Sequence, residues 1–168
     1  MNVDELRARQ APLKDKYREA PEAALIMLKA QGAIGEGVTC RVETGRALVD
    51  AGLHPAAGGD GLALCSGDML LEALVACAGV TLNAVATAIE VELRAGTVRA
   101  EGDLDFRGTL GVSKETPVGF PRIRLHFDLD TDAPADKVAT LIRLTERYCV
   151  VYQTLRQTPE IAISYTAS

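Results

Sequence analysis

Aromatic residues and histidines are scarce in this chain of 168 residues. Tryptophan is absent, and there are only three phenylalanines, four tyrosines and two histidines. The core must therefore be mainly aliphatic, and the length suits one domain. The sequence also contains no Cys-x-x-Cys pair, and His54 and His126 are the only imidazoles that could join a cysteine as ligands. The spacing of a zinc site is thus missing, and we expect no metal and no cofactor.

The chain also has no run of like charges. Its formal net charge is −5, which favours solubility and argues against nucleic acid as a partner. The N-terminus has no apolar stretch behind a basic start, so the sequence predicts no secretory signal. We therefore expect a cytoplasmic protein, in which the four cysteines rest as thiols because that compartment is reducing.

Prolines and strong helix formers alternate at the N-terminus. Pro12 and Pro21 are each followed by residues that favour a helix, and proline is well accepted in a first helical turn. Residues 22–30 (EAALIMLKA) also have the composition of a helix. The sequence therefore predicts a helical N-terminal arm over residues 1–35, followed by the main domain over residues 36–168.

Alternation of apolar and polar residues begins near residue 38 and marks the strands of the main domain. The expected strands are residues 38–43, 46–49, 97–107 (with a break near Gly102), 122–130 and 161–165. Helical patterns are found at residues 135–148 and 149–157. This mixture of strands and helices predicts the α+β class.

Residues 69–89 form the longest stretch with hardly a charge, and they predict a helix that is apolar on every side. About 20 such residues would suffice for a membrane span. Glu72, Thr81, Asn83 and Thr87 interrupt the stretch, and no aromatic belt accompanies it, so a buried helix in a soluble protein is the favoured interpretation. One small domain offers too little cover for such a helix. We therefore expect an intimate homodimer with an extensive isologous interface, and no membrane.

Two cysteines occupy positions that suggest chemistry. Cys77 lies in the middle of the long helix among small residues, which leave room for a ligand or, alternatively, for a tight helix crossing. Cys149 lies between two helical segments, where backbone N–H groups favour a thiolate; the alternative is a plain core cysteine. The two can form a redox pair if the fold brings their Cα atoms within about 7 Å. Cys40 falls on the apolar side of its strand, and Cys65 is either an incidental loop cysteine or an alternative partner.

Residues 66–77 (SGDMLLEALVAC) and residues 148–155 (YCVVYQTL) resemble the two cysteine segments of the OsmC/Ohr family, the osmotically inducible and organic hydroperoxide resistance proteins. The similarity extends from about residue 38 to the C-terminus. It implies an OsmC-like intertwined homodimer, in which antiparallel sheets wrap around a long buried central helix that carries Cys77. This expectation agrees with the burial argument made from the apolar helix.

The resemblance also implies a thiol-dependent peroxidase that reduces organic hydroperoxides. By this interpretation Cys77 attacks the O–O bond and becomes a sulfenic acid, Cys149 resolves it as a disulfide, and an external dithiol reduces the pair. The family stabilises the thiolate with an arginine that is held by a glutamate. Arg46 is the candidate arginine, with Arg41 as the second choice, and Asp68 is the candidate acid.

Two positions differ from the family pattern. Gly67 stands where the family's peroxidases carry the glutamate, and Val150 stands where they carry a proline after the second cysteine. Asp68 and Glu72 are the nearest acids, but Glu72 lies about 140° around the helix from Cys77 and is poorly aimed. These differences support an alternative function: a non-catalytic OsmC-like protein that binds a hydrophobic small molecule at the dimer interface.

Overall fold

The structure is a computed structural model that describes residues 3–34, 40–42, 51–62 and 64–167. Its main sheet has four strands in the order β2-β1-β5-β6, and every neighbouring pair is antiparallel. These strands are β1 (Leu25–Ile34), β2 (Cys40–Val42), β5 (Ala95–Asp105) and β6 (Arg122–Asp130). A separate short parallel pair is formed by β3 (Ala51–Gly52) and β4 (Leu64–Cys65).

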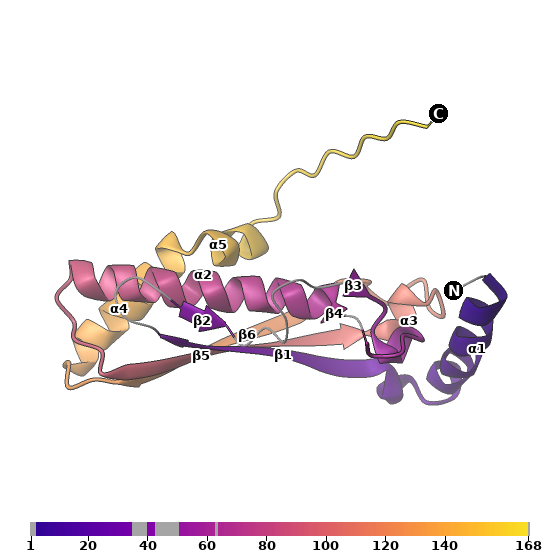
Figure 1. The fold of residues 1–168 in the computed structure, drawn as a ribbon, viewed down its shortest axis with the longest axis horizontal. Helices are drawn as coiled ribbons and strands as arrows, with labels where there is room; N and C mark the ends of the chain where they lie inside the picture. Colours follow the sequence, from indigo (N-terminus) through magenta and orange to yellow (C-terminus); the bar gives the residue numbers. More distant parts are fainter. Residues whose placement is uncertain (1–2, 35–39, 43–50, 63, 168) are drawn as a thin grey trace.

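The longest helix runs along one face of this sheet. Figure 1 shows α2 (Ser66–Ala88) lying against the sheet, with α5 (Val150–Arg156) on the far side of α2. The helix α4 (Ala135–Tyr148) also packs against α2. The end of the molecule away from α4 contains α1 (Val3–Glu19), η1 (Pro21–Ala24), η2 (Pro55–Ala57) and α3 (Phe106–Thr109). Residues 157–167 leave α5 and extend away from the body (Figure 1).

The main core lies between α2 and the sheet. Leu71 and Val75 of α2 are fully buried, as are Val98 and Ala100 of β5. Each large aliphatic side chain buried in this way contributes about 1.5–3 kcal/mol. Odd-numbered residues of β6 pack against the same core, which confirms the alternation predicted for residues 122–130.

A second cluster holds α1 against the rest of the chain. Tyr17, Ala57 and Phe106 are buried together, and the Tyr17 hydroxyl donates to the carbonyl oxygen of Ala56 at 2.8 Å. The side-chain amide of Gln10 donates to the carbonyl oxygen of Ala57 at 3.2 Å. One apolar cluster and two hydrogen bonds therefore fix α1 to η2 and α3.

The N-terminal segment differs from the sequence-based expectation. The helix predicted over residues 22–30 is wrong, because η1 ends at Ala24 and the next ten residues form β1, which pairs with β5 over most of its length. Pairing with a long neighbouring strand outweighs the helix propensity of these residues. Pro12 lies inside α1 rather than at its start, whereas Pro21 opens η1 as expected. The helical part of the predicted arm over residues 1–35 ends before β1.

The break predicted near Gly102 is absent, and β5 continues through this residue. A Cβ atom at Gly102 would lie 2.6 Å from Cε1 of Phe120, which is closer than any real contact. Glycine therefore allows the Phe120 ring to lie on the strand, and it interrupts the alternation without interrupting the strand. The last residues of the predicted strand, 106 and 107, belong to α3 instead.

The C-terminal strand predicted over residues 161–165 does not form. Ile161 is 75% exposed and Ile163 and Tyr165 are each 91% exposed, and no strand of the described residues pairs with them. The alternating pattern is real, but a strand also requires a neighbouring edge. None of the strands in the described residues offers such an edge to this segment.

The other elements of the main domain agree with the sequence more closely. The predicted helix over residues 135–148 coincides with α4, and α5 begins one residue later than the helix predicted from residue 149. The first strand of the domain is represented by β2. The strand predicted over residues 46–49 lies outside the described residues.

In the single chain the long apolar helix packs against the sheet, α4 and α5, but part of its surface stays exposed. By length and composition α2 would also be long enough to cross a membrane, but its sheet-facing side is packed in the core. On the other side Met69, Leu70 and Val80 are each 38–39% exposed. The expectation of burial on every side is therefore not met within one chain, and an apolar surface remains.

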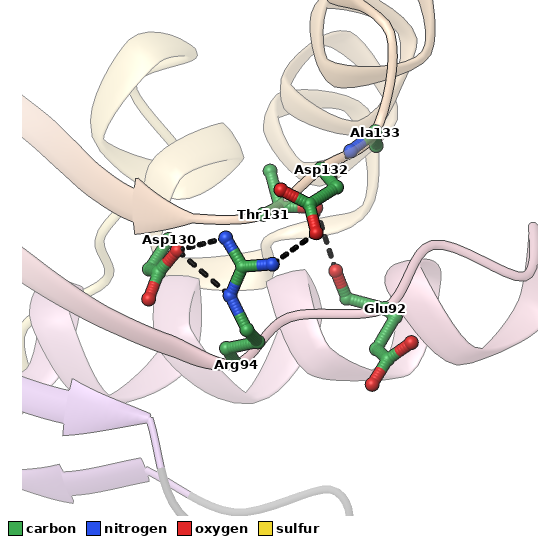
Figure 2. Close-up of polar contacts among 6 residues, drawn as sticks. All are labelled: Glu92, Arg94, Asp130, Thr131, Asp132 and Ala133. Carbon is green, nitrogen blue, oxygen red and sulfur yellow. Dashed lines mark hydrogen bonds and ion pairs between the residues drawn. The ribbon is translucent and has the colours of Figure 1, made fainter.

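An exposed polar cluster joins the start of β5 to the end of β6 (Figure 2). The guanidinium of Arg94 donates to the carboxylate of Asp130 at 3.0 and 2.5 Å and also to Asp132. The Thr131 hydroxyl donates to the carbonyl oxygen of Glu92 at 2.6 Å. Each exposed ion pair contributes little to the free energy of unfolding. The cluster therefore mainly holds the segment before β5 next to the segment that follows β6.

Candidate functional site

The fold brings Cys77 and Cys149 together within one chain. Cys77 lies in the middle of α2 and is half-buried, whereas Cys149 lies between α4 and α5 and is 1% exposed. Both pack in the main core, and each affects the pKa of the other. Both are free thiols in this structure. The two thiols are therefore neighbours in the fold although they are far apart in the sequence.

Local backbone geometry places Cys149 at this position. It ends α4 and also caps the N-terminus of α5, in an extended conformation with φ −71° and ψ 108°. Its sulfur accepts a hydrogen bond from the backbone N–H of Tyr152 at 3.5 Å. The side-chain amide of Gln153 donates to the carbonyl oxygen of Glu146 at 2.6 Å and so ties the two helices together. A helix N-terminus leaves its first N–H groups without partners in the helix, and here they are directed at the thiols.

The surroundings of Cys77 favour its thiolate. Burial raises the pKa of the Cys77 thiol, but hydrogen bonds from the Val151 N–H, the Cys149 thiol, the Thr81 hydroxyl and the Val150 N–H outweigh burial. The net result is a pKa below the ordinary value. Because the thiolate is the reactive form of cysteine, Cys77 is the more reactive of the two thiols.

Cys149 has the opposite tendency. Burial, assisted by its hydrogen bond to Cys77 and by the negative charge there, raises the pKa of Cys149 to about 11, although the N–H groups of Tyr152 and Val151 oppose the rise. At neutral pH Cys149 is therefore protonated. The N–H groups at the start of α5 lower its pKa in the expected direction, but burial outweighs them, so that the alternative of a buried core cysteine describes Cys149 better.

The described residues place neither the expected arginine nor the expected acid next to the thiol pair. Arg46 lies outside the described residues, and Arg41 is described only as a backbone position of β2. Asp68 lies in the first turn of α2, nine residues or about 13 Å along the axis from Cys77. Burial raises the pKa of Asp68 and the nearby His54 lowers it, with no contribution from Cys77. The roles of Arg46 and Asp68 stay predictions.

Cys65 is too distant to replace Cys149. It is the N-cap residue of α2, twelve residues before Cys77. That separation corresponds to about 18 Å along the helix axis, whereas disulfide-bonded cysteines have Cα atoms within about 7 Å. Within one chain the long helix therefore keeps Cys65 from Cys77.

Sequence reasoning missed three partners of Cys77. Two of them, Val150 and Val151, act through backbone N–H groups, which no side-chain pattern reveals. The third, Thr81, follows Cys77 by four residues on the predicted helix, and this spacing was a usable signal. In the described part of the chain, no group of three or more His, Cys, Asp or Glu side chains is placed to hold a metal ion.

A groove of about 570 Å³ lies beside the thiol pair, between β6, α4 and α5. Its lining is formed by Leu74, Phe120, Pro121, Arg122, Ile123, Leu125, Phe127, Ile142, Glu146, Tyr152, Leu155 and Arg156. Leu74 is one turn before Cys77, and Tyr152 donates its N–H to Cys149. The groove therefore shares neighbours with both thiols and presents mainly apolar side chains with a few charges.

Comparison with known proteins places this arrangement in a family. The family model described as OsmC-like protein matches residues 58–164. The fold is similar to an OsmC-like hydroperoxide resistance protein from Jannaschia sp. CCS1, with 20% identity over 86% of this chain and 95% of that chain and a TM-score of 0.60. It is also similar to an OsmC-like protein from Mycoplasma pneumoniae, with 15% identity over 80% of this chain and 86% of that chain and a TM-score of 0.56. Comparison with curated proteins finds no match. Since the matched segment includes α2, both thiols and α5, the chain belongs to the OsmC-like family.

Proposed function

We propose that the protein reduces organic hydroperoxides with Cys77 and Cys149 as a thiol–disulfide pair. One observation carries the proposal: two thiols pack in the same cluster, and their surroundings shift their pKa values in opposite directions. Such divergence separates an attacking thiolate from a thiol that waits in its protonated form. The hydroperoxide resistance protein among the similar structures adds support from its name.

The reaction follows from this arrangement in two steps. The thiolate of Cys77 attacks one oxygen of the O–O bond, so that an S–O bond forms, the O–O bond breaks and the alcohol leaves after taking up a proton. Cys149 then attacks the sulfenic acid of Cys77, forming the disulfide and releasing water. An external dithiol returns two electrons and two protons to the pair. Because the two thiols pack in the same cluster, the second step brings together groups that are already neighbours.

The surroundings of the pair suit an apolar peroxide. The neighbouring groove is lined by leucine, isoleucine and phenylalanine side chains, which gain more from a hydrocarbon group than from water. Hydrogen peroxide offers no such group. An organic hydroperoxide is therefore the better substrate for a thiol in this position.

We also propose that the active form is a homodimer. The outward side of α2 and the start of α5 expose Met69, Leu70, Val80 and Val150, the last of them to 71%. Exposed apolar side chains on two neighbouring helices favour an interaction site here. A second copy that applies the same surface would bury it in an isologous interface, as expected from the apolar sequence of α2. The reducing cytoplasm remains the proposed location because the cycle requires free thiols at its start.

The groove itself favours a second candidate function. Neither cysteine lines the groove, and its volume of about 570 Å³ lies in the range of small-molecule sites. An OsmC-like protein that binds a hydrophobic small molecule without turnover would use this groove and leave the thiols unchanged. Gly67 at the position of the family's glutamate is compatible with this alternative.

Thiol counting separates the two functions. Reduced protein is mixed with a slight excess of cumene hydroperoxide, and free thiols and the non-reduced intact mass are then measured. The peroxidase loses two thiols and 2 Da, and peptide mapping finds the Cys77–Cys149 disulfide. Cys65→Ser is the matched control and should lose two thiols, as the wild type does. Cys77→Ser should lose none and should still be a dimer. Unchanged thiols in the wild-type protein would leave the binding function standing.

A further inference from the structure

The sulfur of Cys77 has a hydrogen-bond partner on its own helix. Thr81 lies four residues after Cys77 on α2, and side chains at this spacing are neighbours on a helix surface. Thr81 and Cys77 are both half-buried, and Thr81 is among the groups that lower the pKa of Cys77. Thr81 lies on the same helix as Cys77, whereas the other groups that lower the pKa of Cys77 belong to residues 149–151.

Other helical threonines show why the hydroxyl reaches this position. The Thr87 hydroxyl donates to the carbonyl oxygen four residues back at 2.9 Å, and the Thr145 hydroxyl does the same at 2.8 Å. For Thr81 the residue four back is Cys77. At this position the side chain four residues back offers a sulfur as a second acceptor beside the backbone carbonyl oxygen.

The properties of threonine make this contact suitable for orienting a thiolate. Threonine is restricted about χ1, so its hydroxyl is held in few directions. Thr81 is half-buried, which reduces competition from water. A hydroxyl that donates to a charged acceptor forms a stronger hydrogen bond than one that donates to a neutral group. The contact therefore strengthens when Cys77 loses its proton.

We propose that Thr81 is a positioning residue of the thiol pair, whose hydroxyl donates to the thiolate of Cys77 and holds the sulfur beside Cys149. The proposal rests on the assignment of Cys77 as the reacting thiol. It adds a side-chain donor to the backbone N–H groups of Val150 and Val151. Losing this donor makes the thiolate harder to form and leaves the sulfur free to rotate.

The test separates the effect of the Thr81 hydroxyl from the effect of the shape of its side chain. Thr81→Val keeps the branched shape and removes the hydroxyl, Thr81→Ser keeps the hydroxyl, and Thr81→Ala removes both should the valine variant not fold. Thr87→Val is the matched control, because it removes a hydroxyl from the same helix that bonds only the backbone. The measurement is the pH profile of Cys77 alkylation by iodoacetamide, resolved by peptide mass and without any hydroperoxide.

The expected result is a profile that moves to higher pH in Thr81→Val and Thr81→Ala. The alkylation rate below the midpoint falls about tenfold, the effect of one hydrogen bond to a charged group. Thr81→Ser stays within about twofold of the wild-type rate, and Thr87→Val leaves the profile unchanged. Equal profiles for wild type and Thr81→Val, or equal shifts in Thr81→Val and Thr81→Ser, would overturn the proposal.

The same proteins separate this proposal from the proposed function. If cumene hydroperoxide leaves the thiols intact while Thr81→Val still shifts the alkylation profile, the peroxidase assignment fails and the role of Thr81 stands. If hydroperoxide oxidises the thiols of every variant and the alkylation profiles coincide, the role of Thr81 fails and the peroxidase stands.

Discussion

Cys149 lowers the pKa of its neighbour Cys77, whereas Cys77 raises the pKa of Cys149, which is itself almost completely buried. This relationship gives the two cysteines different acidities although they are chemically identical. Groups at the start of α5 and on its own helix lower the pKa of Cys77, whereas burial in the core raises the pKa of Cys149. The assignment of an attacking and a resolving thiol depends on this asymmetry.

The first prediction concerns the order in which the thiols react with iodoacetamide. Cys77, whose pKa is lowered, should be alkylated first near neutral pH. A thiol with a pKa of about 11 is ionised in only about one molecule in ten thousand at pH 7, so Cys149 should be labelled last. Peptide mass analysis after short exposures gives the order. Labelling of Cys149 before Cys77 would contradict the assigned asymmetry.

The second prediction concerns stability at alkaline pH. The pKa of Cys149 is raised in the folded state from an ordinary value of 9.0 to about 11. A raised pKa stabilises the folded state below the unfolded-state value, and this contribution is lost as the pH rises through the folded-state value. The free energy of unfolding should therefore fall by about 2–3 kcal/mol between pH 9 and pH 11 on account of this group.

Cys149→Ser isolates this contribution because serine does not titrate in the same range. Urea unfolding is measured with reductant present at several pH values, and the difference between wild type and variant is plotted against pH. The burial-raised pKa of Tyr17 affects both proteins equally and cancels in the difference. A difference that stays constant from pH 9 to pH 11 would show that Cys149 is not buried as described.

Much of the fold followed from local patterns in the sequence. The alternation in β6 and the apolar stripe of α4 gave the bounds of both elements, because each is amphipathic and buries one face. Residues 25–30 have the composition of a helix, and only a partner strand about seventy residues later makes them part of β1. Sequence patterns report one element at a time and do not contain such pairings.

The candidate site was predictable to a different degree. The proximity of Cys77 and Cys149 was implied by resemblance to a family and not by spacing. The backbone donors of Cys77 depend on how α5 begins next to α2, which is a property of the folded chain. Thr81 could have been found from its distance of four residues from Cys77, but a threonine in an apolar helix was interpreted only as evidence against a membrane span.

The third prediction tests the contact between Gly102 and Phe120. A methyl group at Gly102 would lie 2.6 Å from the ring, so Gly102→Ala should force the ring away and destabilise the fold by about 1–3 kcal/mol. Phe120→Ala alone removes buried contacts and should also destabilise. In the double variant the alanine at position 102 meets no ring, so the two costs should not add. Additive costs, measured by urea unfolding, would show that the ring does not lie on this glycine.

The last prediction concerns the exposed side of α2. Val80 is 39% exposed on this helix, and in the proposed homodimer it would be buried against the partner. Val80→Asp should then convert the dimer to monomer, because a buried charge without a partner costs several kcal/mol. Leu62→Asp is the matched control, since Leu62 is 80% exposed and lies outside the helices. Light scattering coupled to size exclusion gives the mass of each protein, and circular dichroism verifies that both are folded. A wild-type monomer, or a dimer that survives Val80→Asp, would show that this side of α2 is not the interface.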